Sequence, residues 1–230
     1  MTDFDRRAVL AATAGLAAAT SAPTALAQTA PPAATFTPQP LPFDPKSVPG
    51  FSEKLLVSHH DNNYAGAVKR LGAIRGDIAK LDWASAPGYL VNGLKREELI
   101  AWNSMVLHEA YFAGFAPAAA PGAPLAKAIE RDFGNHDRWA AEFAAMGKAL
   151  GGGSGWVILT HSAHDGRLVN TWAADHTMTL ANGTPLLVLD MYEHAYHLDY
   201  GAKAAGYVDA FMKAFSWAHA NDALRRATAA

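Results

Sequence analysis

The sequence of 230 residues contains no cysteine. Disulfides, thiolate nucleophiles, zinc fingers and iron-sulfur clusters are therefore excluded, so any bound metal must be held by histidine, carboxylate or neutral oxygen ligands. The absence of cysteine does not fix the compartment, because a protein without disulfides can function on either side of a membrane.

An excess of charge of either sign is also missing. The chain has 19 Lys and Arg against 21 Asp and Glu, and its formal net charge is -2. No basic run is interleaved with aromatic residues, so the chain lacks the electrostatic footprint of a nucleic-acid-binding protein. With 50% hydrophobic and 17% charged residues, the composition is typical of a soluble globular protein, and we expect chemistry on a small molecule.

The N-terminus has the pattern of an export signal. Arg6 and Arg7 precede an Ala-rich apolar stretch that ends at the small-x-small site Ala25-Leu26-Ala27, and this stretch is too short and too rich in alanine for a good bilayer span. We expect residues 1–27 to be a cleaved signal peptide of the twin-arginine type, which exports folded proteins. The mature protein would then be periplasmic and free of the membrane. The alternative is an uncleaved N-terminal anchor.

Seven prolines between positions 31 and 49 disfavour regular structure, so residues 28–50 are expected to be an extended lead-in. Beyond them, apolar positions recur at helical spacing and predict a long helix over residues 52–82 and a second over 95–112. We expect these helices to form an N-terminal helical hairpin domain, residues 51–118.

Each predicted helix carries a histidine on its apolar face, His59 on the first and His108 on the second. A single histidine in such a place is more often a core residue than a ligand. Two buried imidazoles, however, need hydrogen-bond partners or a metal for their nitrogen atoms. The pair therefore makes a simple core role less convincing.

Residues 119–230 differ in character and are expected to form a C-terminal domain. A helix is predicted over 125–149, followed by a glycine-rich break and a β-type run at 156–160. The turn Asp165-Gly166 predicts a hairpin, and the apolar run 185–189 predicts a third strand. The predicted fold class is α+β, with the helical hairpin packed on a domain that has a small antiparallel three-stranded sheet and helices.

The third predicted strand ends on Asp190, and a helix-like segment that contains His194 follows it. The acid is thereby placed at the rim of a buried strand, and the histidine, about one helical turn later, can turn back toward it. A simple helix cap is an equally good explanation of Asp190.

The segment 189–196, Leu-Asp-Met-Tyr-Glu-His-Ala-Tyr, closely resembles the Asp-x-Trp-Glu-His-Ala-Tyr signature of iron/manganese superoxide dismutases. The resemblance also covers His59-His60, the second helix and Gly153-Ser154-Gly155-Trp156, and it spans nearly the whole mature chain. It implies conversion of two superoxide anions and two protons to dioxygen and hydrogen peroxide at one iron or manganese ion per chain. The implied ligands are His59, His108, Asp190 and His194. The same ligand set could also hold zinc.

The resemblance implies further roles around the metal. Trp156, and Tyr192 in place of a family tryptophan, would line the site, although ordinary aromatic core packing explains both equally well. His176 is the expected partner of the metal-bound solvent, with Asp175 as the alternative because this segment aligns ambiguously. Glu193 would reach the ligand histidine of a partner subunit, which implies a homodimer.

The sequence departs from the family pattern beside the first ligand. Ala67 stands where the family has a tyrosine that lines the substrate channel, and Tyr64, nearly one turn earlier, starts from a different height on the helix. Asn63 and His197 replace a histidine and a tyrosine that are expected to meet across the dimer, and we hypothesise that the pair keeps a hydrogen bond. Ser104 stands where iron enzymes supply a glutamine, so the residues do not distinguish iron from manganese.

These departures leave an alternative function open, a metal-binding dimeric relative with a structural role and little turnover. The missing channel tyrosine favours it, whereas the presence of all the ligands favours the dismutase. A third alternative is metal-assisted oxidation of another small substrate in the periplasm, which rests on the opened channel alone.

Overall fold

The computed structural model describes residues 35–229. The predicted signal peptide, residues 1–27, lies outside this range, as does the first part of the predicted lead-in. Residues 35–52 contain turns and irregular backbone but no helix or strand. None of the helices in the described range combines the length and apolar character that crossing a membrane would require.

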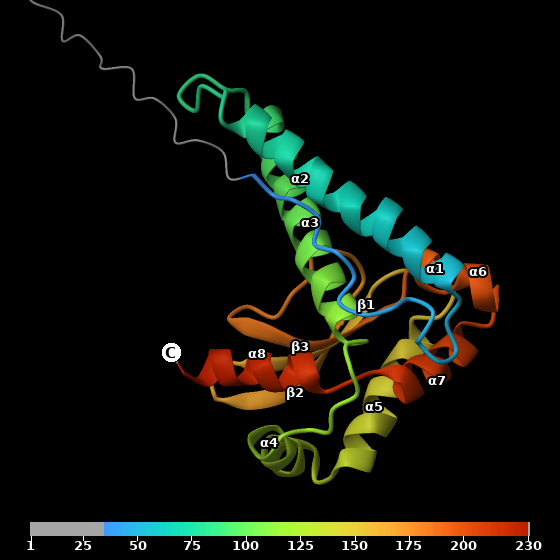
Figure 1. The fold of residues 1–230 in the computed structure, drawn as a ribbon. Coiled ribbons are helices and arrows are strands. Elements are labelled where there is room, and N and C mark those ends of the chain that lie inside the picture. Colours follow the sequence, from blue (N-terminus) through green and yellow to red (C-terminus); the bar gives the residue numbers. More distant parts are fainter. Residues whose placement is uncertain (1–34, 230) are drawn as a thin grey trace, which may run out of the picture. The chain divides into compact units, whose positions relative to one another are not determined.

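Two long helical arms lie side by side (Figure 1). The first arm is continuous and consists of α1 (Glu53–Ser58), the π-helical turn η1 (His59–Tyr64) and α2 (Ala65–Ile78). Ser52 starts this arm, because its side chain accepts a hydrogen bond from the backbone N–H of Leu55. The arm packs against the second helix through η1 and α2. Its apolar residues Leu55, Leu56 and Leu71 are almost fully inaccessible.

The second arm is α3 (Gly88–Ala113). The helix predicted over 52–82 is confirmed, and the one predicted over 95–112 begins earlier, directly after Pro87. Proline is compatible with a helix start because the first N–H groups of a helix have no intrahelical partner. The sequence pattern does not predict the π-helical turn at His59; such turns are frequent at functional sites.

An antiparallel three-stranded sheet forms the centre of the C-terminal half. Its strands are β1 (Trp156–Ser162), β2 (Arg167–Ala173) and β3 (Gly183–Asp190), in the order β2-β1-β3. The predicted sheet is confirmed, including the hairpin turn at Asp165-Gly166 and the position of Asp190 at the end of β3. Gly166 has a φ of +69°, a backbone conformation that favours glycine.

The helix predicted over residues 125–149 is in fact two helices, α4 (Ala123–Phe133) and α5 (His136–Ala149). The prediction of one helix is wrong because Gly134 ends α4 with a φ of +88°. Asn135 then starts α5, since its side chain accepts a hydrogen bond from the backbone N–H of Arg138.

The helix-like segment expected after β3 is also shorter than predicted. It forms the 3-10 turn η2 (Glu193–Ala195), which is separated from α6 (His197–Tyr200) by Tyr196 with a φ of -145°. His194 therefore lies on a tight turn that follows the strand directly, close to Asp190.

Two further helices, α7 (Ala204–Ala214) and α8 (Ala218–Thr228), complete the described chain. In the packed structure α3 and α8 contact β3, α4 contacts β2, and α5 contacts β1 and α7. Residue 118 lies in the connection between α3 and α4, and the proposed domain boundary there stays a prediction.

Two contacts bring the parts of the site together. Trp156, at the start of β1, is paired with Asp190, at the end of β3, across the antiparallel ladder. The first helical arm contacts η2 through α1 and η1, and α3 contacts both η1 and β3. The N-terminal part of the first arm and the part of α3 that contains His108 thus meet the end of the sheet where Asp190 lies.

Candidate metal centre

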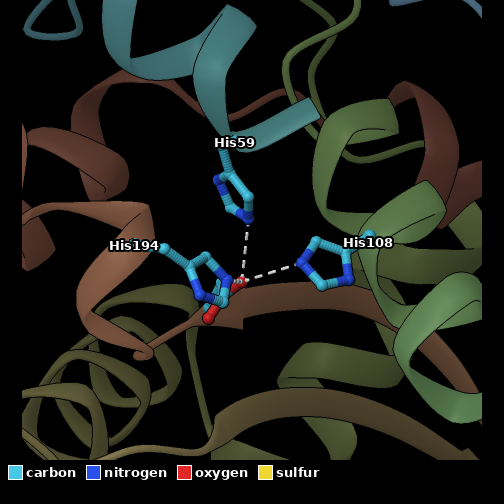
Figure 2. A group of neighbouring side chains, drawn as sticks. His59, His108 and His194 are labelled. Atoms are coloured by element: carbon cyan, nitrogen blue, oxygen red, sulfur yellow. Dashed lines mark hydrogen bonds and ion pairs between the residues drawn. The ribbon is translucent and has the colours of Figure 1, made fainter. Parts of the chain in front are cut away.

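Four side chains from four elements converge at the end of the sheet. His59 comes from η1, His108 from α3, Asp190 from the end of β3 and His194 from η2, and one potential ligand atom from each lies within 4.8 Å of the others. All are buried except His194, whose side chain is 25% exposed. Figure 2 shows the three imidazole rings pointing inward from separate parts of the chain.

One carboxylate oxygen lies at the centre of this cluster. Asp190 Oδ2 is 3.1 Å from His59 Nε2, 3.5 Å from His108 Nε2 and 3.2 Å from His194 Nε2. Each imidazole therefore directs the same nitrogen, Nε2, toward the carboxylate. Such a convergence of three histidines and one aspartate is the arrangement of a mononuclear metal site.

The position of the proton on the His108 ring favours cation binding at the centre. His108 Nδ1 lies 2.6 Å from the carbonyl oxygen of Ser104, so the Nδ1–H donates to that oxygen and Nε2 is left without a proton. Burial lowers the pKa of His108 to about 3, which keeps the ring neutral near pH 7. The Nε2 lone pair then faces the Asp190 carboxylate with no hydrogen-bond partner among the described residues. A bound cation would satisfy both groups.

The other buried candidate ligands, His59 and Asp190, also have protonation states that suit a metal. Burial lowers the pKa of His59 and outweighs the hydrogen bond to Asp190, so this ring too is neutral. Burial by itself raises the pKa of the Asp190 carboxyl, but His194 and His59 together lower it by more, and it lies well below its usual range. Neutral imidazoles and an ionised carboxylate are the forms that bind metal ions.

Hydrogen bonds from the backbone and from a buried tyrosine hold Asp190 in place. The N–H of Tyr192 donates to Asp190 Oδ1 at 2.8 Å, and the hydroxyl of Tyr207 donates to the Asp190 carbonyl oxygen at 2.6 Å. Sequence reasoning missed the role of Tyr207. The available signal is its place on the apolar face of α7 beside Val208 and Phe211, because a phenol buried there must find an acceptor.

The sheet side of the centre is closed by an aromatic wall. The indole N–H of Trp156 donates to Nδ1 of His176 at 3.1 Å, and the indole also meets the ring of His108 edge-on at 5.2 Å. The ring of His176 stacks on Tyr192 with centroids 4.8 Å apart. Burial lowers the pKa of His176, so the neutral ring accepts from Trp156 at Nδ1 and carries its proton on Nε2.

The structure separates the two candidates for the solvent partner. His176 is part of the aromatic wall, with its ring centroid 6.3 Å from that of His108. Asp175 instead accepts hydrogen bonds from the backbone N–H and the hydroxyl of Thr177, at 2.7 Å for the N–H. The hydrogen bond of His176 to metal-bound solvent stays a prediction.

The helix side contains the departures from the family pattern. The Tyr64 hydroxyl accepts from the backbone N–H of Gln39 at 2.8 Å and donates to Glu109 at 2.9 Å. Its two hydrogen bonds therefore connect the Tyr64 hydroxyl to the lead-in segment and to α3. Burial raises the pKa of Tyr64 to about 12, which keeps the hydroxyl protonated. Ala67, buried on α2, presents no polar group at all.

The residues predicted to meet a second subunit are accessible. Glu193 and His197 are exposed, and Asn63 is half-buried. None of these side chains forms a hydrogen bond with another residue in the range 35–229. Their predicted contacts across a dimer are untested by a single chain.

The comparisons with known proteins agree with the geometry of the centre. Residues 121–223 match the family described as "Iron/manganese superoxide dismutases, C-terminal domain". An iron superoxide dismutase of Cupriavidus metallidurans is 63% identical over 182 residues, which cover 79% of this chain and 92% of that protein. An iron superoxide dismutase of Aquifex aeolicus is 34% identical over 80% of this chain and 88% of its own length. A manganese superoxide dismutase of Halobacterium salinarum is 32% identical over 77% of this chain and 89% of its own length.

Proposed function

Since this chain belongs to the iron/manganese superoxide dismutase family, we propose that it is an oxidoreductase that converts two superoxide anions and two protons to dioxygen and hydrogen peroxide. The observation that carries the proposal is the bare Nε2 of His108 facing the Asp190 carboxylate. These groups, with His59 and His194, form a donor set that fits iron or manganese.

The chemistry divides between the ion and the chain. A bound iron or manganese ion, which has stable divalent and trivalent states, would accept an electron from one superoxide and return it to another. The side chains of His59, His108, Asp190 and His194 would hold the ion. The Trp156 indole fixes the His176 ring so that its Nε2 carries the proton, and this N–H is our candidate donor to solvent or substrate at the centre. The stacked ring of Tyr192 keeps His176 in this orientation.

We take iron as the metal, supported by the name of the 63% identical relative, an iron enzyme. The ligands by themselves suit either metal. Ser104 contributes its backbone carbonyl to His108, and its short side chain carries no metal preference that can be read from its contacts.

The first experiment is elemental analysis of the purified protein, combined on the same sample with an assay of superoxide decay. We expect about one iron per chain and rapid decay, since the donor set is that of a mononuclear site. His108→Ala should lose both, whereas His164→Ala, which changes an exposed histidine in the β1–β2 turn, should lose neither. Manganese in place of iron would change the metal assignment alone. Zinc or no metal would refute the redox centre.

The second candidate function is that of a structural, metal-binding relative. Ala67 has no hydroxyl, and the hydroxyl of Tyr64 is bonded to Glu109, so the helix side lacks the channel hydroxyl of the family. The same sample distinguishes the two functions. Iron bound at full occupancy without superoxide decay would favour the structural protein.

We further infer that the protein is a homodimer in which Glu193 of each subunit reaches the ligand histidine of the other. The support is that Glu193 and His197 are exposed beside the partly exposed His194. Glu193→Ala should dissociate the dimer in sedimentation experiments, whereas Glu53→Ala, an exposed acid at the start of α1, should not. His197→Ala tests the pair with Asn63, and unchanged activity and dimerisation would contradict that pair.

Export to the periplasm by the twin-arginine route is also part of the proposal. It rests on the sequence pattern of residues 1–27, which lie outside the described residues. Expression of the full chain should give a periplasmic product whose mass corresponds to cleavage after Ala27, and Arg6→Lys with Arg7→Lys should retain it in the cytoplasm. A full-length product in the membrane fraction would indicate an anchor instead.

A further inference from the structure

A cavity of 440 Å³ lies between α4 and α8, at the end of β1 that is remote from the metal centre. We call it the α4/α8 cavity. Its volume is within the usual range of small-molecule sites, about 300 to 1,000 Å³. The side chains important for its chemistry are Leu125, Ala128, Arg131, His161, Leu224 and Arg225.

The α4/α8 cavity is separate from the metal centre. Trp156, at one end of β1, contacts the ligand His108, whereas His161 lies five residues further along the same strand. At about 3.3 Å per residue, this spacing corresponds to about 16 Å along the strand. Side chains alternate along a strand, so His161 and Trp156 also point to opposite faces of the sheet.

His161 is the first sign of a ligand. It is only 5% exposed, and its Nδ1 is buried without a hydrogen-bond partner among residues 35–229. A buried polar atom without a partner costs free energy, and nearly all such atoms in folded proteins are satisfied by protein, solvent or ligand. His161 lines the cavity, so a molecule bound there would contact this imidazole.

Two arginines give the cavity its charge. Arg131 donates to Asp132, a carboxylate that it shares with Arg167, and to the carbonyl of Gly166, so its guanidinium is fixed in place. Arg225 contacts Asp222, the one carboxylate that lines the cavity, only through Nη2 at 3.3 Å. Both partners of this pair are exposed, and exposed pairs contribute little. Arg225 is therefore available to bind an anion.

The remaining wall is apolar. Leu125 and Leu224 are buried, with 1% and 5% of their surface exposed, and Ala128 lines the cavity from α4, three residues after Leu125. Asn221 is occupied, because its side chain accepts from the N–H of Gly122 and donates to the carbonyl of Ala120. The cavity thus offers an apolar surface beside a guanidinium and an imidazole.

We propose that the α4/α8 cavity binds a small organic carboxylate, with its apolar body against Leu125, Ala128 and Leu224 and its carboxylate between Arg225 and His161. Arginine suits this role because its planar guanidinium can pair with both oxygens of a carboxylate. The site is independent of the proposed dismutase activity, since no metal ligand lines it.

The test uses the full, metal-loaded protein and calorimetric titration with benzoate, which combines a carboxylate with an apolar ring. Benzoate should bind saturably, one molecule per chain. Arg225→Gln should weaken binding about tenfold or more, because a charge-assisted hydrogen bond is lost. Arg226→Gln is the matched control, since this exposed arginine is adjacent on α8 but does not line the cavity.

Two further measurements make the assignment specific. Ala128→Phe should fill the cavity and abolish benzoate binding, with metal content and the rate of superoxide decay unchanged. Benzyl alcohol, which lacks the charge, and inorganic phosphate, which lacks the apolar body, should each bind more weakly than benzoate. No saturable benzoate binding, equal binding of phosphate or benzyl alcohol, or binding unaffected by Arg225→Gln and Ala128→Phe would overturn the proposal. The last result would place benzoate elsewhere, for example at the metal.

Discussion

The two sides of the metal centre differ in how they are built. The sheet side, formed by Trp156, His176, Asp190 and Tyr192, is a connected set of hydrogen bonds and stacked rings. The helix side supplies His59 and His108, but its neighbouring residues depart from the family pattern and direct their polar groups elsewhere. We infer that both sides would hold the metal, that the sheet side also orients solvent at the centre, and that the residues around the helix-side ligands influence substrate access and turnover rate.

The largest effect should come from Asp190, which belongs to the sheet side and touches all three ligand histidines. Asp190→Asn removes the negative charge at the centre, and we expect metal affinity to fall at least about 100-fold, since loss of outer hydrogen-bond partners already costs about 10 to 100-fold. Activity should fall with it. Asp175→Asn is the control, because the Asp175 carboxylate accepts its hydrogen bonds from Thr177. Full metal occupancy in Asp190→Asn would contradict the assignment.

The metal-free protein should lose stability in acid in two separate steps. The pKa of His108 is about 3 in the folded chain against 6.5 when unfolded, and that of His59 is lowered too. The unfolded state therefore gains protons first, and stability falls by a few kcal/mol as the pH drops below 6.5. The sheet side responds later, because the lowered pKa of Asp190 stabilises the fold above 3.8 and this contribution is lost only as the pH falls further.

Urea unfolding of the metal-free protein at a series of pH values measures these steps. His108→Gln should flatten the first step, between pH 6.5 and 4, because the titrating ring is gone. A stability that stays constant from pH 7 to pH 4 in the unchanged chain would show that the two histidines are not buried as neutral rings.

A smaller effect is expected when one tyrosine on each side of the centre is replaced by phenylalanine. Tyr207→Phe removes the donor to the Asp190 carbonyl, and Tyr64→Phe removes the hydroxyl shared by Gln39 and Glu109. Tyr207→Phe should lower the free energy of unfolding by about 1 to 3 kcal/mol, because the buried Asp190 carbonyl loses a donor, and Tyr64→Phe by about 0.5 to 1.5 kcal/mol, because Gln39 is exposed and Glu109 half-buried. Only Tyr207→Phe should also weaken metal binding. Tyr89→Phe, at an 81% exposed position, is the control, and equal metal affinities in all three variants would remove the distinction.

The sequence predicts those parts of the centre whose signals lie within short segments of the chain. The periodic apolar faces around His59 and His108 and the order of strand, Asp190 and His194 predict the elements, whereas the set of four residues that converge is implied by the resemblance to the family signature. The signals that it missed are set by contacts between distant segments. The hydrogen bond from Tyr207 to Asp190 joins α7 to the end of β3, and the π-helical turn that begins at His59 lies where the first arm contacts α3 and η2.

The break between α4 and α5 shows a different limit. Gly134 and Asn135 are a local stop and start signal within a stretch that is otherwise apolar at helical spacing. The overall periodicity outweighed this signal in the prediction because one glycine in a helix costs only about 1 kcal/mol. The positive φ of Gly134 ends α4, and this backbone conformation cannot be read from the sequence.

The smallest effect, and the sharpest test of the comparison, is Ala67→Tyr on the helix side. The family places a channel tyrosine there, whereas Ala67 is a buried alanine on α2 and Tyr64 cannot supply its hydroxyl to the centre while it binds Glu109. We expect metal content to stay the same and the rate of superoxide decay to rise severalfold, because a hydroxyl near the centre adds a proton donor. Ala65→Tyr, on the same helix but not buried, should change neither. A fall in metal content would mean that position 67 affects the placement of the helix-side ligands, and the assignment of this position to turnover alone would fail.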